Sequence, residues 1–68
     1  MGSKEQLAKI FLEAREKIGL TQLEVAKKAK ISVNYYARVE RGEAKPRWDI
    51  VDQIAKALDI KLKLPLES

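Results

Sequence analysis

Apolar residues recur through most of the chain with the three- and four-residue spacing of amphipathic helices. Four segments show this spacing, at about residues 4–18, 21–29, 32–41 and 48–58. The sequence therefore predicts four helices that share one core. The residues expected to contribute to this core are Leu7, Ile10, Phe11, Ala14, Ile18, Leu20, Val25, Ala26, Ala29, Tyr36, Val39, Ile50, Val51, Ile54, Ala55 and Leu58.

Residues 21–42 carry the start and stop signals of two short helices. Thr21 and Glu24 have the spacing of a capping box, in which a hydroxyl and a carboxylate satisfy exposed N–H groups at a helix start. Ser32 is placed to be the N-cap of the next helix, which Gly42 can end in a left-handed conformation. Helices this short and this close must cross steeply. The arrangement is a helix-turn-helix, whose second helix can enter a DNA major groove.

The period changes at the C-terminal tail, residues 60–66, where apolar side chains alternate with lysine or proline as in a strand. A single strand in a helical domain has no neighbour for its backbone hydrogen bonds. We therefore expect it to pair with the same strand of a second chain; the alternative is an extended tail that lays its leucines on the core. The predicted dimer interface consists of Trp48, Ile60, Leu62 and Leu64.

Length and composition limit the kind of protein. The 68 residues form one domain, 1–68, near the lower size limit for a core that is not cross-linked by disulfides or metals. Cysteine and histidine are absent, which excludes disulfides, thiolate zinc sites and imidazole chemistry. No apolar run approaches the ~20 residues that span a bilayer, and there is no signal-peptide segment, so we expect a cytoplasmic protein without membrane contact. Residues 1–3 are treated as a cloning remnant.

Positive charge is concentrated in the middle of the chain. The net charge is +4, and residues 21–47 hold seven basic against three acidic side chains, while the charges of the two ends cancel. A charge run is commonly only a solvated face, which stays an alternative for Lys27 and Lys28. Its concentration on the segment suspected of meeting phosphates favours DNA binding.

Residues 15–58 resemble the phage-repressor and Cro class of helix-turn-helix domains, also called the xenobiotic-response-element type. The matching pieces are GLTQLEVAKKAKIS, RVERGEAKP and IAKAL. The resemblance implies an all-α, four-helix, lambda-repressor-like fold, to which the tail would add a short β-strand. The segment after ALDI is similar to a subset that includes many antitoxins of toxin–antitoxin operons, in which C-terminal strands pair across a dimer.

The resemblance also implies a role for individual residues. Gln22, in the first turn of the second helix, would bind a phosphate together with the helix N-terminus and brace the recognition helix; an ordinary exposed glutamine is the alternative. The side chains expected to contact base edges are Val33, Asn34, Tyr35 and Arg38. Those expected to contact the DNA backbone are Gln22, Thr21, Lys27, Arg41, Lys45 and Arg47.

The chemistry of these side chains indicates what each could read. Asn34 can form two hydrogen bonds with adenine, and Arg38 two with guanine. Val33 could contact only an apolar surface such as a thymine methyl group. For Tyr35 two interpretations stay open: a contact with DNA, or an ordinary aromatic side chain at the surface. Tyr36 is expected in the core with its hydroxyl at the edge.

Two further features follow from the resemblance. Arg15 and Glu40 match a pair that ties the first helix to the third, with two separate surface charges as the alternative. Lys30 stands at the turn position where the family usually has glycine, and a left-handed conformation is costly for any other residue.

The residues do not favour an enzyme. There is no histidine, no cysteine and no Gly-Lys-Ser/Thr phosphate loop, and the hydroxyls of Thr21 and Ser32 are already assigned as caps. Asp49 and Asp52 lie three positions apart and could bind a metal only weakly; such a pair is generally a solvated face. We therefore predict no catalytic residue, metal or cofactor.

The sequence thus predicts a sequence-specific transcriptional regulator, a repressor that binds double-stranded DNA as a homodimer on a palindromic operator, because one small domain makes few base contacts. The alternative is an antitoxin-type interaction module that binds a partner toxin and autoregulates its operon. A DNA-binding domain cut from a longer protein is a third interpretation.

Overall fold

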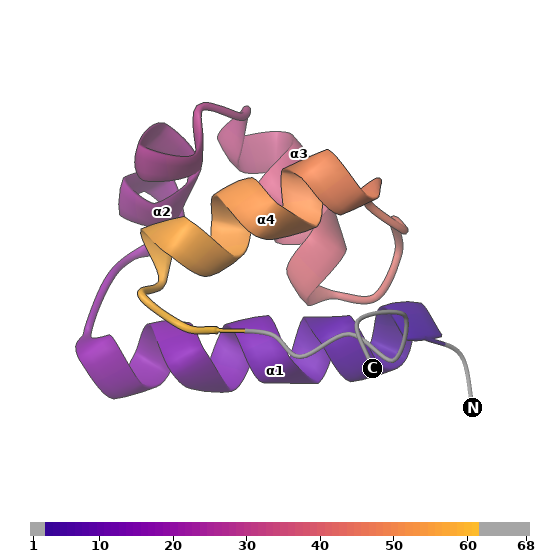
Figure 1. Ribbon diagram of the computed structural model, residues 1–68, viewed down its shortest axis with the longest axis horizontal. Coiled ribbons are helices and arrows are strands. Elements are labelled where there is room, and N and C mark those ends of the chain that lie inside the picture. Colours follow the sequence, from indigo (N-terminus) through magenta and orange to yellow (C-terminus); the bar gives the residue numbers. More distant parts are fainter. Residues whose placement is uncertain (1–2, 62–68) are drawn as a thin grey trace.

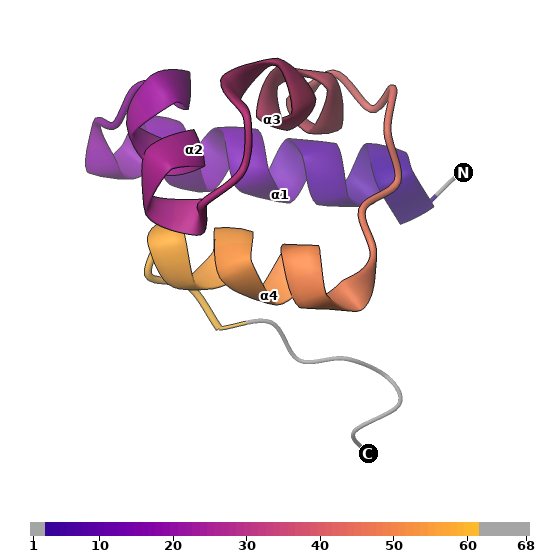
Figure 2. The same ribbon diagram turned by 90° about the horizontal axis from the view of Figure 1, so that it is seen from above.

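The computed structural model describes residues 3–61, with the side chain of residue 3 left out. Four helices make up this part of the chain: α1 (Ser3–Ile18), α2 (Gln22–Ala29), α3 (Val33–Glu40) and α4 (Trp48–Ala57). α1 and α4 run in roughly the same direction, and α2 lies towards the C-terminal ends of both (Figures 1 and 2). α2 packs against α3 and α4, and α1 packs against α3. The four predicted helices are confirmed.

The predicted N-terminal caps of α2 and α3 are present. The Thr21 hydroxyl accepts a hydrogen bond from the Glu24 N–H at 3.1 Å, and the Glu24 carboxylate accepts one from the Thr21 N–H at 2.8 Å. The Ser32 hydroxyl accepts a hydrogen bond from the Tyr35 N–H at 3.0 Å. Because each cap satisfies N–H groups that have no partner inside the helix, these residues fix where α2 and α3 begin.

Each helix ends around one residue in the left-handed region: Gly19, Lys30, Gly42 or Asp59. After α2, the Lys30 N–H donates to the Lys27 carbonyl and the Ile31 N–H donates to the Ala26 carbonyl, at 3.2 and 3.0 Å. This pair of bonds is the Schellman arrangement, which turns the chain sharply after a helix. Lys30 adopts φ 62°, a left-handed conformation that glycine reaches more easily. The turn therefore forms at the predicted position even though lysine stands where the family usually has glycine.

Replacing Lys30 with glycine should stabilise the domain. A left-handed conformation costs roughly 1–2 kcal/mol for a residue with a Cβ, part of which is offset by the greater entropy of glycine in the unfolded chain. We expect a gain of about 1 kcal/mol in the free energy of unfolding, measured by urea denaturation. Lys30→Ala is the matched control, since it removes the same charge but keeps the Cβ, and it should show no such gain. Equal stabilities of the two variants would contradict the strain argument.

The core contains most of the predicted residues. Its fully enclosed members are Phe11, Val25, Ala26, Ala29, Tyr36, Val39, Val51, Ile54 and Leu58. The prediction was wrong for Ile10 and Ile18, which are 41% and 46% exposed, while Ala8 is buried. Ile10 lies about 100° around the helix from Phe11. Ile18 shares the side of Phe11 but lies in the last turn, where α1 ends.

The aromatic residues Tyr36 and Trp48 lie at opposite extremes of burial. The hydroxyl of Tyr36 was predicted at the edge of the core, but the whole side chain is buried. Trp48, which the sequence predicted at a dimer interface, is 53% exposed in the first turn of α4. An aromatic side chain of this size left half in water is a candidate contact residue.

The described part of the tail does not form a strand. The Ile60 N–H donates to the Ala55 carbonyl at 2.9 Å, which belongs to the turn after α4. Ile60 packs against the core of its own chain. Its predicted place in a strand is not confirmed, and the turn already uses its backbone N–H. Leu62, Leu64 and the rest of the predicted strand lie outside the described residues.

Candidate nucleic-acid interface

α4 packs against α2, the first helix of the helix-turn-helix formed by α2 and α3. The Gln53 side chain donates a hydrogen bond to the carbonyl of Ala29, in the last turn of α2. Ile31, in the turn between α2 and α3, packs against the core. Together these contacts fix the turn that orients α3. Sequence reasoning missed Gln53, since nothing local distinguishes it from an exposed helical glutamine.

A polar cluster of Arg15, Gln22 and Glu40 ties α3 to the two preceding helices. Arg15 donates to the two carboxylate oxygens of Glu40 at 2.6 and 3.1 Å, and also to the Leu20 carbonyl at 2.9 Å. The Gln22 side-chain amide donates to the same carboxylate at 2.9 Å. The carboxyl group of Glu40 is nearly buried, with its side chain 3% exposed. The predicted Arg15–Glu40 pair is thus formed, and Gln22 braces the C-terminal end of α3.

The cluster keeps Glu40 ionised although it is buried. Burial by itself would raise the pKa of Glu40, but the bonds from Arg15 and Gln22 and the nearby Tyr36 hydroxyl outweigh it, so the pKa lies below its ordinary value. Burial raises the pKa of Tyr36, and the Glu40 carboxylate raises it further. The Tyr36 hydroxyl is close enough for this influence without reaching hydrogen-bonding geometry among the described residues.

The outward side of α3 carries two of the predicted base-contacting residues. Asn34 and Arg38 are exposed, and their four-residue spacing places them on the same side of the helix. Val33 and Tyr35 are half-buried and pack against the core. Of the four residues predicted to contact bases, Asn34 and Arg38 are therefore the most accessible, while Val33 and Tyr35 expose only part of their surface.

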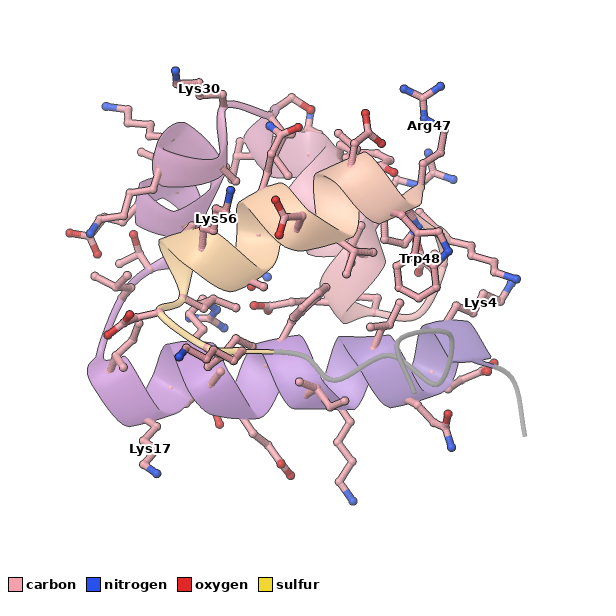
Figure 3. The ribbon with its side chains drawn as sticks, viewed as in Figure 1. Lys4, Lys17, Lys30, Arg47, Trp48 and Lys56 are labelled. Carbon is pink, nitrogen blue, oxygen red and sulfur yellow. The ribbon has the colours of Figure 1, made fainter. Side chains whose placement is uncertain are left out.

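The predicted backbone-contacting cations are all at the surface. Lys27 and Lys45 are exposed. Arg41 and Arg47 are exposed as well, and pair with Glu43 at 3.0 Å and Asp49 at 3.3 Å. Exposed ion pairs of this kind are weak, so a phosphate could replace the carboxylates. Figure 3 shows Lys30 and Arg47 at the edge of the molecule away from α1, whereas Lys17 lies on the outer side of α1.

The exposed side chains of α3 have the chemistry needed to read base edges in a major groove. A short helix exposes an amide and a guanidinium, which can each make two hydrogen bonds to a purine. Cations stand on α2 and on the loop that follows α3, where they can meet phosphates on either side. In the part of the chain that the structure describes, no helix is long and apolar enough to cross a membrane.

Comparisons with known proteins agree with this geometry. The searches of curated proteins and of solved structures gave no match. A family model described as helix-turn-helix matches residues 11–64, which covers α2, α3, α4 and most of α1. The chain therefore belongs to the Cro/C1-type helix-turn-helix family, a family of DNA-binding transcription regulators.

Proposed function

We propose that this protein is a repressor that binds a palindromic operator as a homodimer, with α3 in the major groove. The observation that carries the proposal is the exposed pair Asn34 and Arg38 on a helix whose C-terminal end is fixed by the Arg15–Gln22–Glu40 cluster. A recognition helix must be held rigidly if its hydrogen bonds are to distinguish one base from another.

The homodimer follows from the number of contacts that one copy can make. A single α3 of eight residues offers two exposed side chains, Asn34 and Arg38, for contact with bases. Two copies related by a two-fold axis would read two half-sites about one helical turn apart, ~34 Å, and so double the contacts. We place this activity in the cytoplasm, where the protein would need no cofactor.

The operator sequence should depend on Asn34 and Arg38. After selection from a random duplex pool, the wild type should yield a consensus, and Asn34→Ala and Arg38→Ala should each relax it at one position per half-site. Each lost pair of hydrogen bonds is worth about 1–3 kcal/mol of discrimination. Arg41→Ala is the matched control, because it should weaken binding to all sequences without changing the consensus. An unchanged consensus for both α3 variants would show that another surface reads the bases.

The antitoxin-type interpretation differs in its requirement for a second protein. If the chain alone selects a duplex, the regulator proposal is supported. If it selects one only after its operon neighbour is added, the partner-binding module is the better description.

A further inference from the structure

A groove of about 610 Å³ is lined by residues of α4 and of the segment that follows it, and by none of α2 or α3. Its apolar lining includes Trp48, Val51, Ala55 and Ile60. Val51 and Ala55 are nearly buried at its base, while Trp48 stands half-exposed at one end. The DNA-contacting residues predicted on α2 and α3 are not part of it, so the groove is a separate surface.

The polar lining of the groove carries both signs of charge. Asp52 and Lys56 are exposed and form an ion pair one turn apart, with 3.1 Å between the ammonium nitrogen and a carboxylate oxygen. Asp59 and Lys61 lie at the end remote from Trp48. Figure 3 shows Trp48 and Lys56 along the visible side of α4. Because aspartates and lysines alternate along the lining, the lining of one copy can be complementary in charge to that of a second copy.

A two-fold axis at the level of position 54 satisfies both the charges and the apolar residues. If α4 of a second copy runs antiparallel across this axis, Asp52 of each copy faces Lys56 of the other. The same register carries Trp48 of each copy beyond the C-terminal end of the other α4, towards the turn that holds Ile60, because α4 ends at Ala57. This coincidence of charge and apolar pairing in one register is what a self-complementary, isologous interface requires.

We propose that the α4 groove is the docking site for α4 of a second copy, an inference that rests on the homodimer of the proposed function. The interface differs from pairing of the C-terminal strands and can form without it. α4 is about 15 Å long for its ten residues, so the contact is smaller than the roughly 800 Å² per partner of a standard interface. The free dimer is therefore weak and is favoured on the operator, where DNA holds both copies.

Trp48 reports on the groove directly, because it is the one tryptophan of the chain. Its fluorescence emission should shift to shorter wavelength as protein concentration rises, in parallel with the dimer fraction from sedimentation. If residues 62–68 of the same chain filled the groove instead, the emission would be independent of concentration and would change when those residues are deleted. That result would overturn the proposal, as would a protein that stays monomeric in solution and also binds the two half-sites of an operator independently of each other.

Charge reversal separates contacts between copies from those within one. Asp52→Lys and Lys56→Asp should each weaken self-association by roughly tenfold, since like charges then face each other across the axis. An equimolar mixture of the two variants should associate as well as the wild type, because each lysine of one faces an aspartate of the other. The repulsion inside each helix is the same in the mixture, so recovery can come only from contact between copies. A mixture that stays monomeric would overturn the proposal.

The proposal that α4 binds a second copy and the proposal that the protein binds DNA can be tested separately. Trp48→Glu should be monomeric but should still bind a duplex that carries a single half-site. Ile18→Glu, at a similarly exposed apolar residue outside the groove, should dimerise normally. A dimeric Trp48→Glu protein would contradict only the groove, whereas loss of all duplex binding by the wild type would contradict only the regulator.

Discussion

Replacing Arg15 with alanine should remove about 3–5 kcal/mol from the free energy of unfolding, the cost of leaving a buried carboxylate without its charged partner. Glu40 would keep only the Gln22 amide as a side-chain donor among the described residues. A domain of this size has about 3–10 kcal/mol in all, so this loss is a large part of the total. Circular dichroism during urea titration measures the loss.

Arg41→Ala is the matched control for this experiment. It removes an arginine with the same two-bond geometry to a carboxylate, that of Glu43, but both side chains are more than half exposed. Water can replace the lost bonds, so no measurable change in stability is expected. If the two variants were equally stable, the buried cluster would not hold the fold together.

The same cluster predicts how stability depends on pH. The pKa of Glu40 is lower in the folded chain than its ordinary value. A carboxyl group of this kind contributes stability above the unfolded pKa of about 4.3, and the contribution is lost as pH falls through the lower folded value. The decrease in the free energy of unfolding at acid pH should therefore be smaller in Glu40→Gln than in the wild type.

DNA affinity should fall steeply with salt. Lys27, Arg41, Lys45 and Arg47 of two copies offer eight exposed cations to the phosphates. A protein that makes six to ten phosphate contacts loses roughly 10³- to 10⁵-fold in affinity between about 50 and 200 mM salt, because released counterions drive binding. Titrations of an operator duplex by fluorescence anisotropy at several salt concentrations would measure the slope.

Lys45→Ala should lower the magnitude of that slope by about 0.9 per copy, or about 1.8 for the dimer, with equal weakening on all duplexes. Lys17→Ala removes the same charge from the outer side of α1 (Figure 3) and should leave the slope unchanged. A slope that responds equally to both variants would mean that only the net charge matters, and that the assigned phosphate contacts are wrong.

Local signals in the sequence determined the helices and their ends. Thr21 and Glu24 satisfy each other's backbone N–H, and Ser32 begins α3, because capping depends on residues three positions apart. Helical spacing likewise placed Val25, Ala26 and Val39 in the core. The pair Arg15 and Glu40 was predicted through family resemblance, not through spacing.

Packing between distant segments decided the rest. The sequence could not show that Gln53 of α4 reaches the Ala29 carbonyl, or that Tyr36 is buried together with its hydroxyl. Periodicity identifies an apolar side of a helix but not how much of it neighbouring helices cover, so Ile10 and Ile18 were misplaced. The α4 groove arises only when α4 lies on α2 with its other side turned outwards. The sequence by itself therefore determined the helices and where they begin, and the tertiary structure decided which apolar residues remain exposed, because exposure depends on how distant helices pack.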